Sequence, residues 1–187
     1  SENFPLRPYQ TEAVQAILDA ISNNKRRMSV HMATGTGIHR VGAELIAALL
    51  VIRKAEKQKS ITALFDRKES IEQFEKLCED ICAERDGLRL ACFTFANASA
   101  EKRAALRESD FILYYYGNIS PSDAYKENKV FQKMQIAADS CLKENGKLIL
   151  DICDDDLSAM LKIKQDGEEP ADYMLSLPEE RLMAIGK

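Results

Sequence analysis

The stretch Met32-Ala33-Thr34-Gly35-Thr36-Gly37-Ile38-His39-Arg40 decides the fold of this 187-residue chain. It follows an apolar segment, Met28 to Ala33, and leads into a segment with a broad apolar face, from about Gly37 to Ala55. This order predicts a strand, a glycine-containing loop and a helix. Loops of this kind surround phosphates with backbone N–H groups, a Lys neutralises phosphate charge, and a Ser or Thr hydroxyl binds Mg²⁺. Here Ile38 and His39 stand where the Lys and the Thr are expected.

The rest of the chain alternates short apolar segments with segments of helical periodicity. We expect helices over 8–23, 37–55, 68–83, 99–108 and 128–142 and from 157 onward, and strands over 28–33, 61–65, 88–93, 111–116 and 147–153. Strands separated by helices imply right-handed crossovers and a mainly parallel sheet with helices on both faces. The predicted fold class is therefore α/β with three layers, in one domain over 1–187.

Two polar segments follow strands of this predicted sheet. The loop Thr34 to Gly37 follows one strand, and the acidic segment Asp151 to Asp156 ends another. In parallel sheets ligands bind beyond the carboxyl ends of the strands, so a phosphate loop and a carboxylate cluster can share one crevice. We therefore expect Gly35 and Gly37 at a strand-to-helix junction that faces Asp151.

Composition limits the function classes. The net charge of −4 argues against a globally basic nucleic-acid binder, although Lys25 to Arg27 and Arg53 to Lys59 are local candidates for phosphate contacts or simply solvated surface. The longest apolar run, Val41 to Ile52, is shorter than the ~20 residues that span a bilayer. No secretory signal opens the sequence, so we expect a cytoplasmic protein without membrane partners. The five cysteines form no C-x-x-C pair, and a zinc site is not expected.

With these residues placed, the chain resembles the first RecA-like domain of superfamily 2 helicases, closest to the helicase subunits of type I and type III restriction enzymes. The segment Leu6-Arg7-Pro8-Tyr9-Gln10 is similar to the entry motif of that group, in which Gln10 would read the adenine edge. Ala33 to Gly37 matches the phosphate loop of the family, and the sequence departs from it at Ile38 and His39. The resemblance implies a nucleotide-binding site lined by Gln10, Thr34, Gly35, Thr36, Gly37, Ile38 and His39.

Two further segments are similar to the nucleic-acid motifs of the family. Leu64 to Glu69 resembles a loop that touches the DNA backbone, so Arg67 and Lys68 are candidate phosphate contacts or exposed charges at a helix start. Phe111 to Tyr116 resembles a strand that helps to hold the nucleic acid, and Tyr116 is the candidate base contact. Because alternation sends neighbouring tyrosines to opposite faces, core packing explains most of them equally well.

The segment Leu148 to Asp154 occupies the place of the apolar strand that ends in Asp-Glu-Ala-His in the family. By resemblance Asp151 would keep the Mg²⁺-associated carboxylate. Ile152 replaces the Glu that activates the attacking water, and Asp154 replaces the His that couples the nucleotide site to DNA. Leu175 to Pro178 weakly resembles the Thr-Ala-Thr-Pro motif, and a strand with a turn explains it as well.

The resemblance implies ATP and Mg²⁺ as cofactors, but the substitutions predict weak or absent binding. Ile38 cannot make charge-assisted bonds of ~1.5–3 kcal/mol to phosphate. Loss of a general base costs about 10²–10⁴ in rate, and an imidazole at His39 is a poor ligand for hard Mg²⁺. A competing interpretation is that Asp154 or Asp155 replaces the missing Glu, which would restore hydrolysis.

Two function classes compete. The first is an N-terminal, ATP-binding-type domain of a helicase or translocase with impaired hydrolysis, which reaches DNA through its parent protein. It would need a second RecA-like domain or a partner subunit, since 187 residues hold only one such domain. The alternative is a non-catalytic scaffold that binds nucleic acid or protein. A third possibility, an unrelated small-molecule phosphotransferase, lacks a supporting nucleophile or base.

Overall fold

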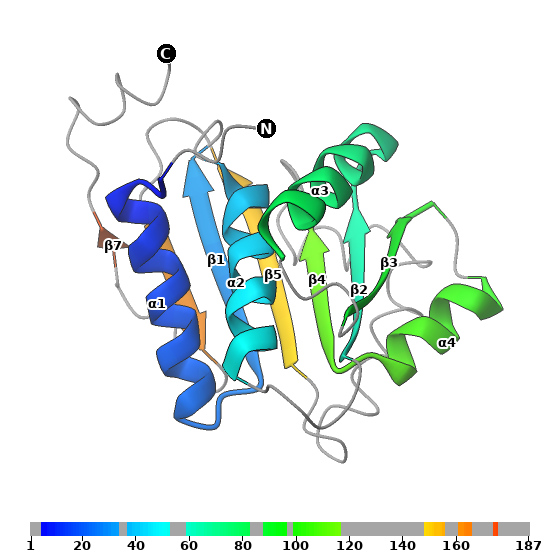
Figure 1. Cartoon of the computed structure of the whole chain (residues 1–187), viewed down its shortest axis with the longest axis horizontal. Coiled ribbons are helices and arrows are strands. Elements are labelled where there is room, and N and C mark those ends of the chain that lie inside the picture. Colours follow the sequence, from blue (N-terminus) through cyan, green and yellow to red (C-terminus); the bar gives the residue numbers. More distant parts are fainter. Residues whose placement is uncertain are drawn as a thin grey trace.

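The chain folds into a mixed α/β structure, seen here in a computed structural model that describes residues 5–33, 37–52, 59–82, 88–96, 99–116, 148–155, 161–165 and 174–175. The elements in chain order are α1 (Pro8–Ser22), β1 (Arg27–Ala33), α2 (Ile38–Ile52), β2 (Lys59–Phe65), α3 (Lys68–Ile81), β3 (Leu88–Thr94), α4 (Ala100–Glu108), β4 (Phe111–Tyr115), β5 (Leu148–Asp155), β6 (Leu161–Gln165) and β7 (Met174–Leu175). Figure 1 shows this arrangement.

The strands form one sheet with the order β3-β2-β4-β5-β1-β6-β7. All pairs from β3 to β1 are parallel, whereas β6 and β7 extend the β1 edge antiparallel. The carboxyl ends of the five parallel strands therefore lie along one edge, where β1 leads into α2 and β2 leads into α3. The prediction of a mainly parallel sheet is confirmed.

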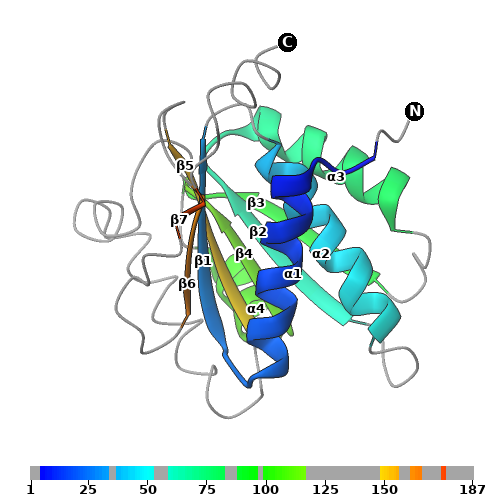
Figure 2. The same cartoon turned by 90° about the vertical axis from the view of Figure 1, so that its left-hand side faces the viewer.

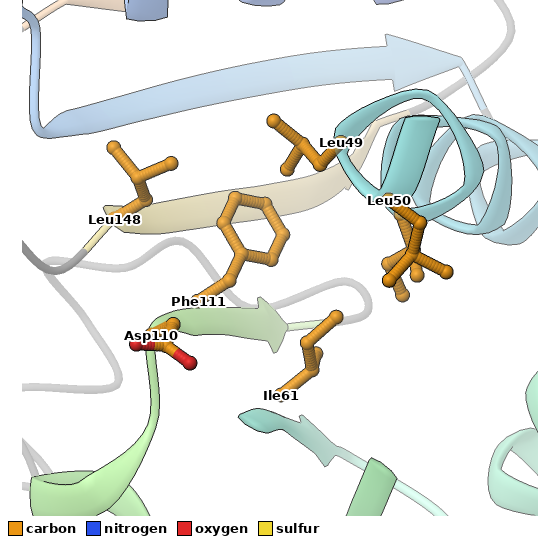
Figure 3. Close-up of a pocket in the computed structure, with 7 residues that line it drawn as sticks. Leu49, Leu50, Ile61, Asp110, Phe111 and Leu148 are labelled. Atoms are coloured by element: carbon orange, nitrogen blue, oxygen red, sulfur yellow. The ribbon is translucent and has the colours of Figure 1, made fainter. Parts of the chain in front are cut away.

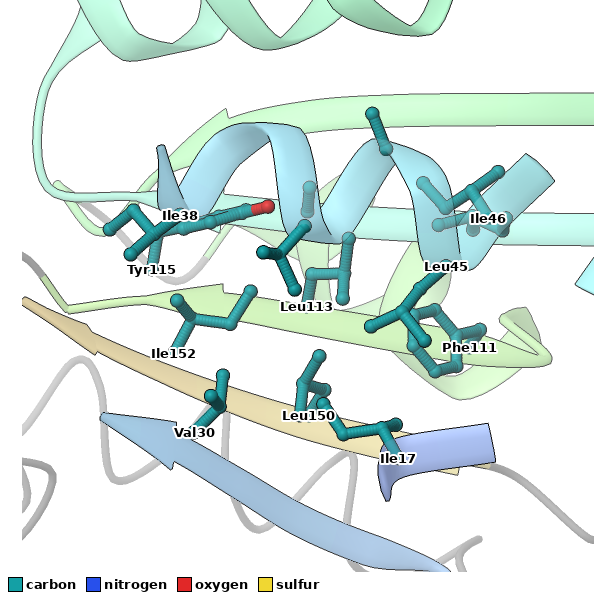
Figure 4. Packing of buried hydrophobic residues seen from close by; sticks show 14 of the residues in the cluster. Ile17, Val30, Ile38, Leu45, Ile46, Phe111, Leu113, Tyr115, Leu150 and Ile152 are labelled. Carbon is teal, nitrogen blue, oxygen red and sulfur yellow. The ribbon is translucent and has the colours of Figure 1, made fainter. Parts of the chain in front are cut away.

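Helices α1, α2 and α3 cover one face of the sheet, as Figure 2 shows, and α4 packs against the other face. The larger core packs α1, α2 and α3 against one face, with side chains such as Ile17, Val30, Leu45 and Leu113 (Figure 4). A smaller core on the other face joins Leu106 of α4 to strand residues. Every residue of β4 is buried, because this central strand has a core on each side. The three-layer architecture follows from these two cores.

Local sequence explains how the helix that leads to the site begins. Pro8 fills the first turn of α1, where its missing N–H costs nothing. Gln10 closes a capping box with Arg7, and its Oε1 accepts a hydrogen bond from the Arg7 backbone N–H at 3.0 Å. Ala13 and Ile17 then bury a stripe against the sheet, which fixes the start of α1 near the loop.

The largest error of the sequence prediction concerns the segment after β5. A helix from Leu157 is wrong over Leu161–Gln165, which form β6. Leucine and isoleucine alternate with lysine in this segment, a period of two, and the open edge of β1 offers an antiparallel partner. The helix expected over 128–142 lies outside the described residues.

A small apolar cavity lies at the opposite, amino-end edge of the sheet. It has a volume of about 20 Å³, enough for about one water molecule. Figure 3 shows its lining between the end of α2 and the starts of β2, β4 and β5, formed by Ile46, Leu49, Leu50, Ile61, Asp110, Phe111 and Leu148. A nucleotide does not fit in this cavity, so it does not compete with the carboxyl edge as a ligand site.

Candidate nucleotide site

The junction between β1 and α2 has the geometry that the sequence predicts. β1 ends at Ala33, α2 begins at Ile38, and Gly37 between them has φ +79°, a left-handed conformation that favours glycine. The prediction of a strand-to-helix junction is therefore confirmed for Gly37. Thr34, Gly35 and Thr36 lie outside the described residues, so their predicted contacts with phosphate stay a prediction.

Gln10 lies directly beside this junction. A Cβ atom added to Gly37 would come 2.5 Å from Gln10 Nε2, so a larger residue at position 37 would displace the amide. Gln10 is 7% exposed, and its Oε1 is engaged by the Arg7 backbone. Gln10, the residue predicted to contact adenine, thus lies beside the loop, and its side-chain carbonyl caps α1. The contact with adenine itself stays a prediction.

The two residues that replace Lys and Thr are packed into the protein. Ile38 is 9% exposed and belongs to the larger core, at the same end as Tyr115 and Ile152 (Figure 4). The imidazole of His39 stacks on Tyr115, with ring centroids 4.8 Å apart and planes 15° apart, and on Phe65 at 5.8 Å. Neither side chain extends toward a phosphate from the loop.

His39 is one member of an aromatic stack, defined here as His39, Phe65, Phe74 and Tyr115. Phe65 and Tyr115 lie nearly parallel, with centroids 4.7 Å apart, and Phe74 is tilted against both. Aromatic pairs of this kind contribute about 0.5–1.5 kcal/mol each beyond their buried area. The stack joins α2, β2, α3 and β4, so it stabilises the packing of α2 and α3 on the carboxyl ends of β2 and β4.

The polar atoms of this stack are poorly satisfied. His39 Nδ1 and Tyr115 Oη are buried without a hydrogen-bond partner among the described residues. Burial lowers the pKa of His39, an effect that the nearby charge of Asp66 opposes and that of Arg67 reinforces. Burial also raises the pKa of Tyr115 well above its usual value. Both rings are therefore neutral at pH 7.

Gly42, one turn into α2, allows this packing. A Cβ atom at this position would collide with Tyr115 Oη. The helix can therefore lie close to β4 only because position 42 has no side chain. Gly42 and Tyr115 together set the distance between α2 and the sheet at the point where His39 stacks.

Asp151 lies elsewhere than the sequence prediction places it. It is in register with Ser29, four positions before the Ala33–Asp155 pair at the carboxyl end. Its side chain faces the α4 side of the sheet, because it bonds to Tyr116 of the smaller core. The expectation that the loop junction faces Asp151 is therefore wrong: the junction and α2 lie on the other face.

The carboxylate of Asp151 is engaged by two partners. Arg27 binds it in a bidentate manner, with Nε–Oδ2 at 2.9 Å and Nη2–Oδ1 at 3.2 Å. Tyr116 Oη donates to Oδ1 at 2.6 Å. Burial, followed by the negative charge of Asp151, raises the pKa of Tyr116 well above its usual value. In this network, Arg27–Asp151–Tyr116, both oxygens of the carboxylate that was predicted to accompany Mg²⁺ are bound by protein side chains.

The predicted nucleic-acid contacts differ in their access. Arg67 is the residue before α3 and makes no capping hydrogen bond with its side chain, which is 72% exposed and lies 3.7 Å from Asp66. Lys68 begins α3 and is exposed as well. Tyr116, in contrast, is 3% exposed and stacks on Phe95 at 6.0 Å, so its ring is not available to a base. All three consecutive tyrosines, from Tyr114 to Tyr116, are buried.

Asp154 lies closer to the loop than Asp151 does. It pairs with Met32 in the parallel register, and its neighbour Asp155 pairs with Ala33, the last residue of β1. The backbone of the acidic segment therefore reaches the carboxyl edge beside the loop, as expected. The side chains of both residues lie outside the part of the chain that the structure describes, so their roles stay predictions.

The described residues do not fit Mg²⁺ at this site. Mg²⁺ prefers hard oxygen ligands in octahedral geometry at about 2.0–2.1 Å. The position of the metal-binding hydroxyl holds a stacked imidazole, and the aromatic side chains around it offer only one unpartnered phenol. Among the described residues there is no group of three His, Cys, Asp or Glu side chains that could hold a metal.

Sequence reasoning missed four residues that shape the site: Arg27, Gly42, Phe65 and Tyr115. Strict alternation along Phe111–Tyr115 does place Tyr115 opposite Tyr114 and Tyr116, so one signal was present. What the sequence lacked was the strand order, which puts β4 and β2 under the start of α2.

A strand, a loop and a helix N-terminus at the carboxyl edge of this three-layer sheet define a RecA-like domain. Residues 3–143 match the family described as type III restriction enzyme, res subunit. This match covers most of the chain, so the chain belongs to that family and contains its helicase-like superfamily 2 domain. Members of the family normally use ATP and Mg²⁺ and work with nucleic-acid and subunit partners. A comparison with curated proteins found no match.

None of the helices in the described part of the chain has both the length and the apolar character required to cross a bilayer.

Proposed function

We propose that this chain is the N-terminal, ATP-binding-type domain of a superfamily 2 DNA helicase or translocase in which ATP hydrolysis is impaired. The observation that supports this proposal is the stacking of His39 on Tyr115, with centroids 4.8 Å apart, at the position of the metal-binding hydroxyl. A motor that cannot hold Mg²⁺ beside the phosphates loses the electrostatic stabilisation on which phosphoryl transfer depends.

The replacement of lysine by Ile38 is expected to weaken nucleotide binding, independently of its effect on hydrolysis. A lysine there would make charge-assisted bonds of ~1.5–3 kcal/mol to phosphate, and each 1.4 kcal/mol is about tenfold in affinity. Ile38 instead contributes its side chain to the core. Nucleotide affinity is therefore expected to be at least about tenfold weaker than with the lysine.

DNA remains the proposed partner, through the parent protein. Arg67 and Lys68 lie exposed after β2, on the carboxyl edge where the loop also lies. In motors of this type ATP is closed between two RecA-like domains, so we expect a second such domain or a partner subunit to complete the assembly. Residues 1–187 would then form one domain of it.

The alternative, a non-catalytic scaffold that binds nucleic acid or protein, has one observation in its favour. The aromatic stack uses the position of the metal-binding hydroxyl for internal packing, and the Arg27–Asp151–Tyr116 network engages the buried carboxylate on the other face of the sheet. Such packing stabilises a rigid platform rather than a site that opens and closes around a substrate.

Calorimetry with ATP and Mg²⁺, followed by a phosphate-release assay with DNA present, tests the proposal. We expect no Mg²⁺-dependent binding with a micromolar Kd, and phosphate release no faster than without protein. Phosphate release that depends on both ATP and the protein would contradict impaired hydrolysis and support rescue by Asp154 or Asp155. Micromolar binding without hydrolysis would argue against the scaffold.

A further inference from the structure

The neighbours of His39 identify the part of the sheet that faces the metal-ligand position of the loop. These neighbours are Tyr115 at the end of β4 and Phe65 at the end of β2. Two oxygen ligands of one Mg²⁺ ion each lie about 2.1 Å from it, so a second ligand must come from a residue in direct contact with position 39. Positions 65 and 115 both contact His39, and position 115 is the nearer, with ring centroids 4.8 Å apart against 5.8 Å for Phe65.

Asp151 does not meet this condition. It lies on the opposite face of the sheet, in register with Ser29 in the middle of β1, and its carboxylate is bound by Arg27 and Tyr116. A carboxylate on that face is separated from His39 by the sheet itself. Asp151 of β5 is therefore excluded as the metal ligand, both because it lies in the middle of the strand and because its side chain points to the other face.

The extent of the family match is consistent with β4, instead of β5, as the strand that carries the acidic motif. It covers residues 3–143, which contain β4 and end before β5 begins at Leu148. The acidic motif of the family follows an apolar strand, and β4 is an apolar strand that is buried at every position. Tyr115 and Tyr116 are the residues at its carboxyl end, and they point to opposite faces.

We infer that Tyr115 and Tyr116, not Asp151 and Ile152, stand in the place of the metal-binding and base carboxylates of the family, and that the aromatic stack fills the metal position. This inference rests on the proposed function, because it assumes that the loop derives from a nucleotide site. The chain has therefore lost both carboxylates as well as the lysine and the hydroxyl. The metal position has become hydrophobic core.

A rebuilt metal site tests this assignment without ATP. His39→Asp combined with Tyr115→Asp would place two carboxylates against each other, and Mn²⁺ serves as the probe because it accepts the same oxygen ligands. We expect Mn²⁺ to raise the thermal midpoint of this double variant by several degrees, since a ligand that binds only the folded state stabilises it.

The chain offers a matched control for this variant. Tyr114 neighbours Tyr115 on the same strand, is equally buried, and faces the opposite side of the sheet. His39→Asp with Tyr114→Asp, and His39→Asp alone with Asp151 intact, should show no shift with Mn²⁺. An equal shift in either control, or a folded His39→Asp/Tyr115→Asp protein that does not respond to Mn²⁺, would overturn the inference.

A second measurement uses milder variants and covers the case in which paired carboxylates prevent folding. The chain has only two histidines, so the imidazole protons of His39 are easily assigned by NMR. We expect the ring currents of Tyr115 and Phe65 to displace these signals, and Tyr115→Leu to reduce the displacement while Tyr114→Leu leaves it unchanged. The reverse pattern would show that Tyr115 does not face His39 and would overturn the inference. Neither measurement depends on nucleotide, so ATP hydrolysis by the wild-type protein would contradict the proposed function alone.

Discussion

Two adjacent tyrosines at the end of β4 have opposite environments. Tyr115 faces α2 and lies in an aromatic stack, where its hydroxyl is buried without a hydrogen-bond partner among the described residues. Tyr116 faces the α4 side, where its hydroxyl donates to Asp151 at 2.6 Å. The same side chain thus acts as a hydrophobic filler on one face and as a hydrogen-bond donor to a buried charge on the other.

This difference shows where the carboxyl edge keeps its charge. On the α4 side a buried carboxylate is retained because Arg27 and Tyr116 satisfy it. On the α2 side, where a nucleotide site of the family would need charge, the side chains next to His39 are aromatic. Substitutions in both regions measure how far this contrast extends.

The largest effect is expected from Asp151→Asn. Removing one partner of a fully buried ion pair costs about 3–5 kcal/mol, and we expect roughly 2–3 kcal/mol here because the Arg27 side chain is 30% exposed. Urea unfolding measures the loss.

The same variant separates structure from metal binding. If Asp151 supports the fold and not a metal, its loss of stability should be equal with and without Mg²⁺. Arg27→Met should lose stability as well, because it leaves the Asp151 carboxylate with one partner fewer. A stability difference for Asp151→Asn that appears only when Mg²⁺ is added would restore the metal role of this residue.

An intermediate effect, with opposite signs, is expected for the tyrosine pair. Tyr116→Phe removes a hydrogen bond to a charged group, but Arg27 still binds the carboxylate, so the protein should be destabilised by about 1.5 kcal/mol. Tyr115→Phe removes a buried hydroxyl without a partner and should stabilise it by about 1 kcal/mol. Each variant is the control for the other, and equal changes in the free energy of unfolding would remove the contrast on which this comparison depends.

The smallest effect concerns pH. Burial lowers the pKa of His39 in the folded protein, with Asp66 and Arg67 as the charged groups that act on it. Below the unfolded pKa of about 6.5, the unfolded chain binds the proton more readily, so stability falls as the pH decreases from there. His39→Phe keeps a stacked ring and should weaken this decline between pH 7.5 and pH 5.5. An identical pH dependence in both proteins would show that His39 is not protected by the stack.

The sequence was sufficient for most of the fold because periodicity is local. The apolar stripe with Ala13 and Ile17 defined α1, and the Gly37 junction defined the start of α2. β6 was missed because Leu161–Gln165 alternates for only five residues, too short a segment to outweigh the expectation of another helix. Its partner strand, β1, is distant in sequence, and this tertiary pairing decides its conformation.

The site was harder to predict because it depends on which strands are neighbours. A carboxylate at the end of an apolar strand suggested a metal ligand at Asp151, but register and alternation place it in mid-strand and on the other face. Tyr115 carries no sequence signal for a ligand position. It acquires one only when the strand order brings β4 under His39.

Gly42 and Tyr115 constrain each other, because the tyrosine hydroxyl fills the space that a side chain at position 42 would need. A side chain larger than hydrogen at position 42 collides with the Tyr115 hydroxyl, whereas loss of the Tyr115 ring, as in Tyr115→Asp, leaves an unfilled space against the glycine. Gly42→Ala or Tyr115→Asp alone therefore lowers stability. The effects of substitutions at these two positions are therefore coupled, because the side chain that fits at one position depends on the residue at the other.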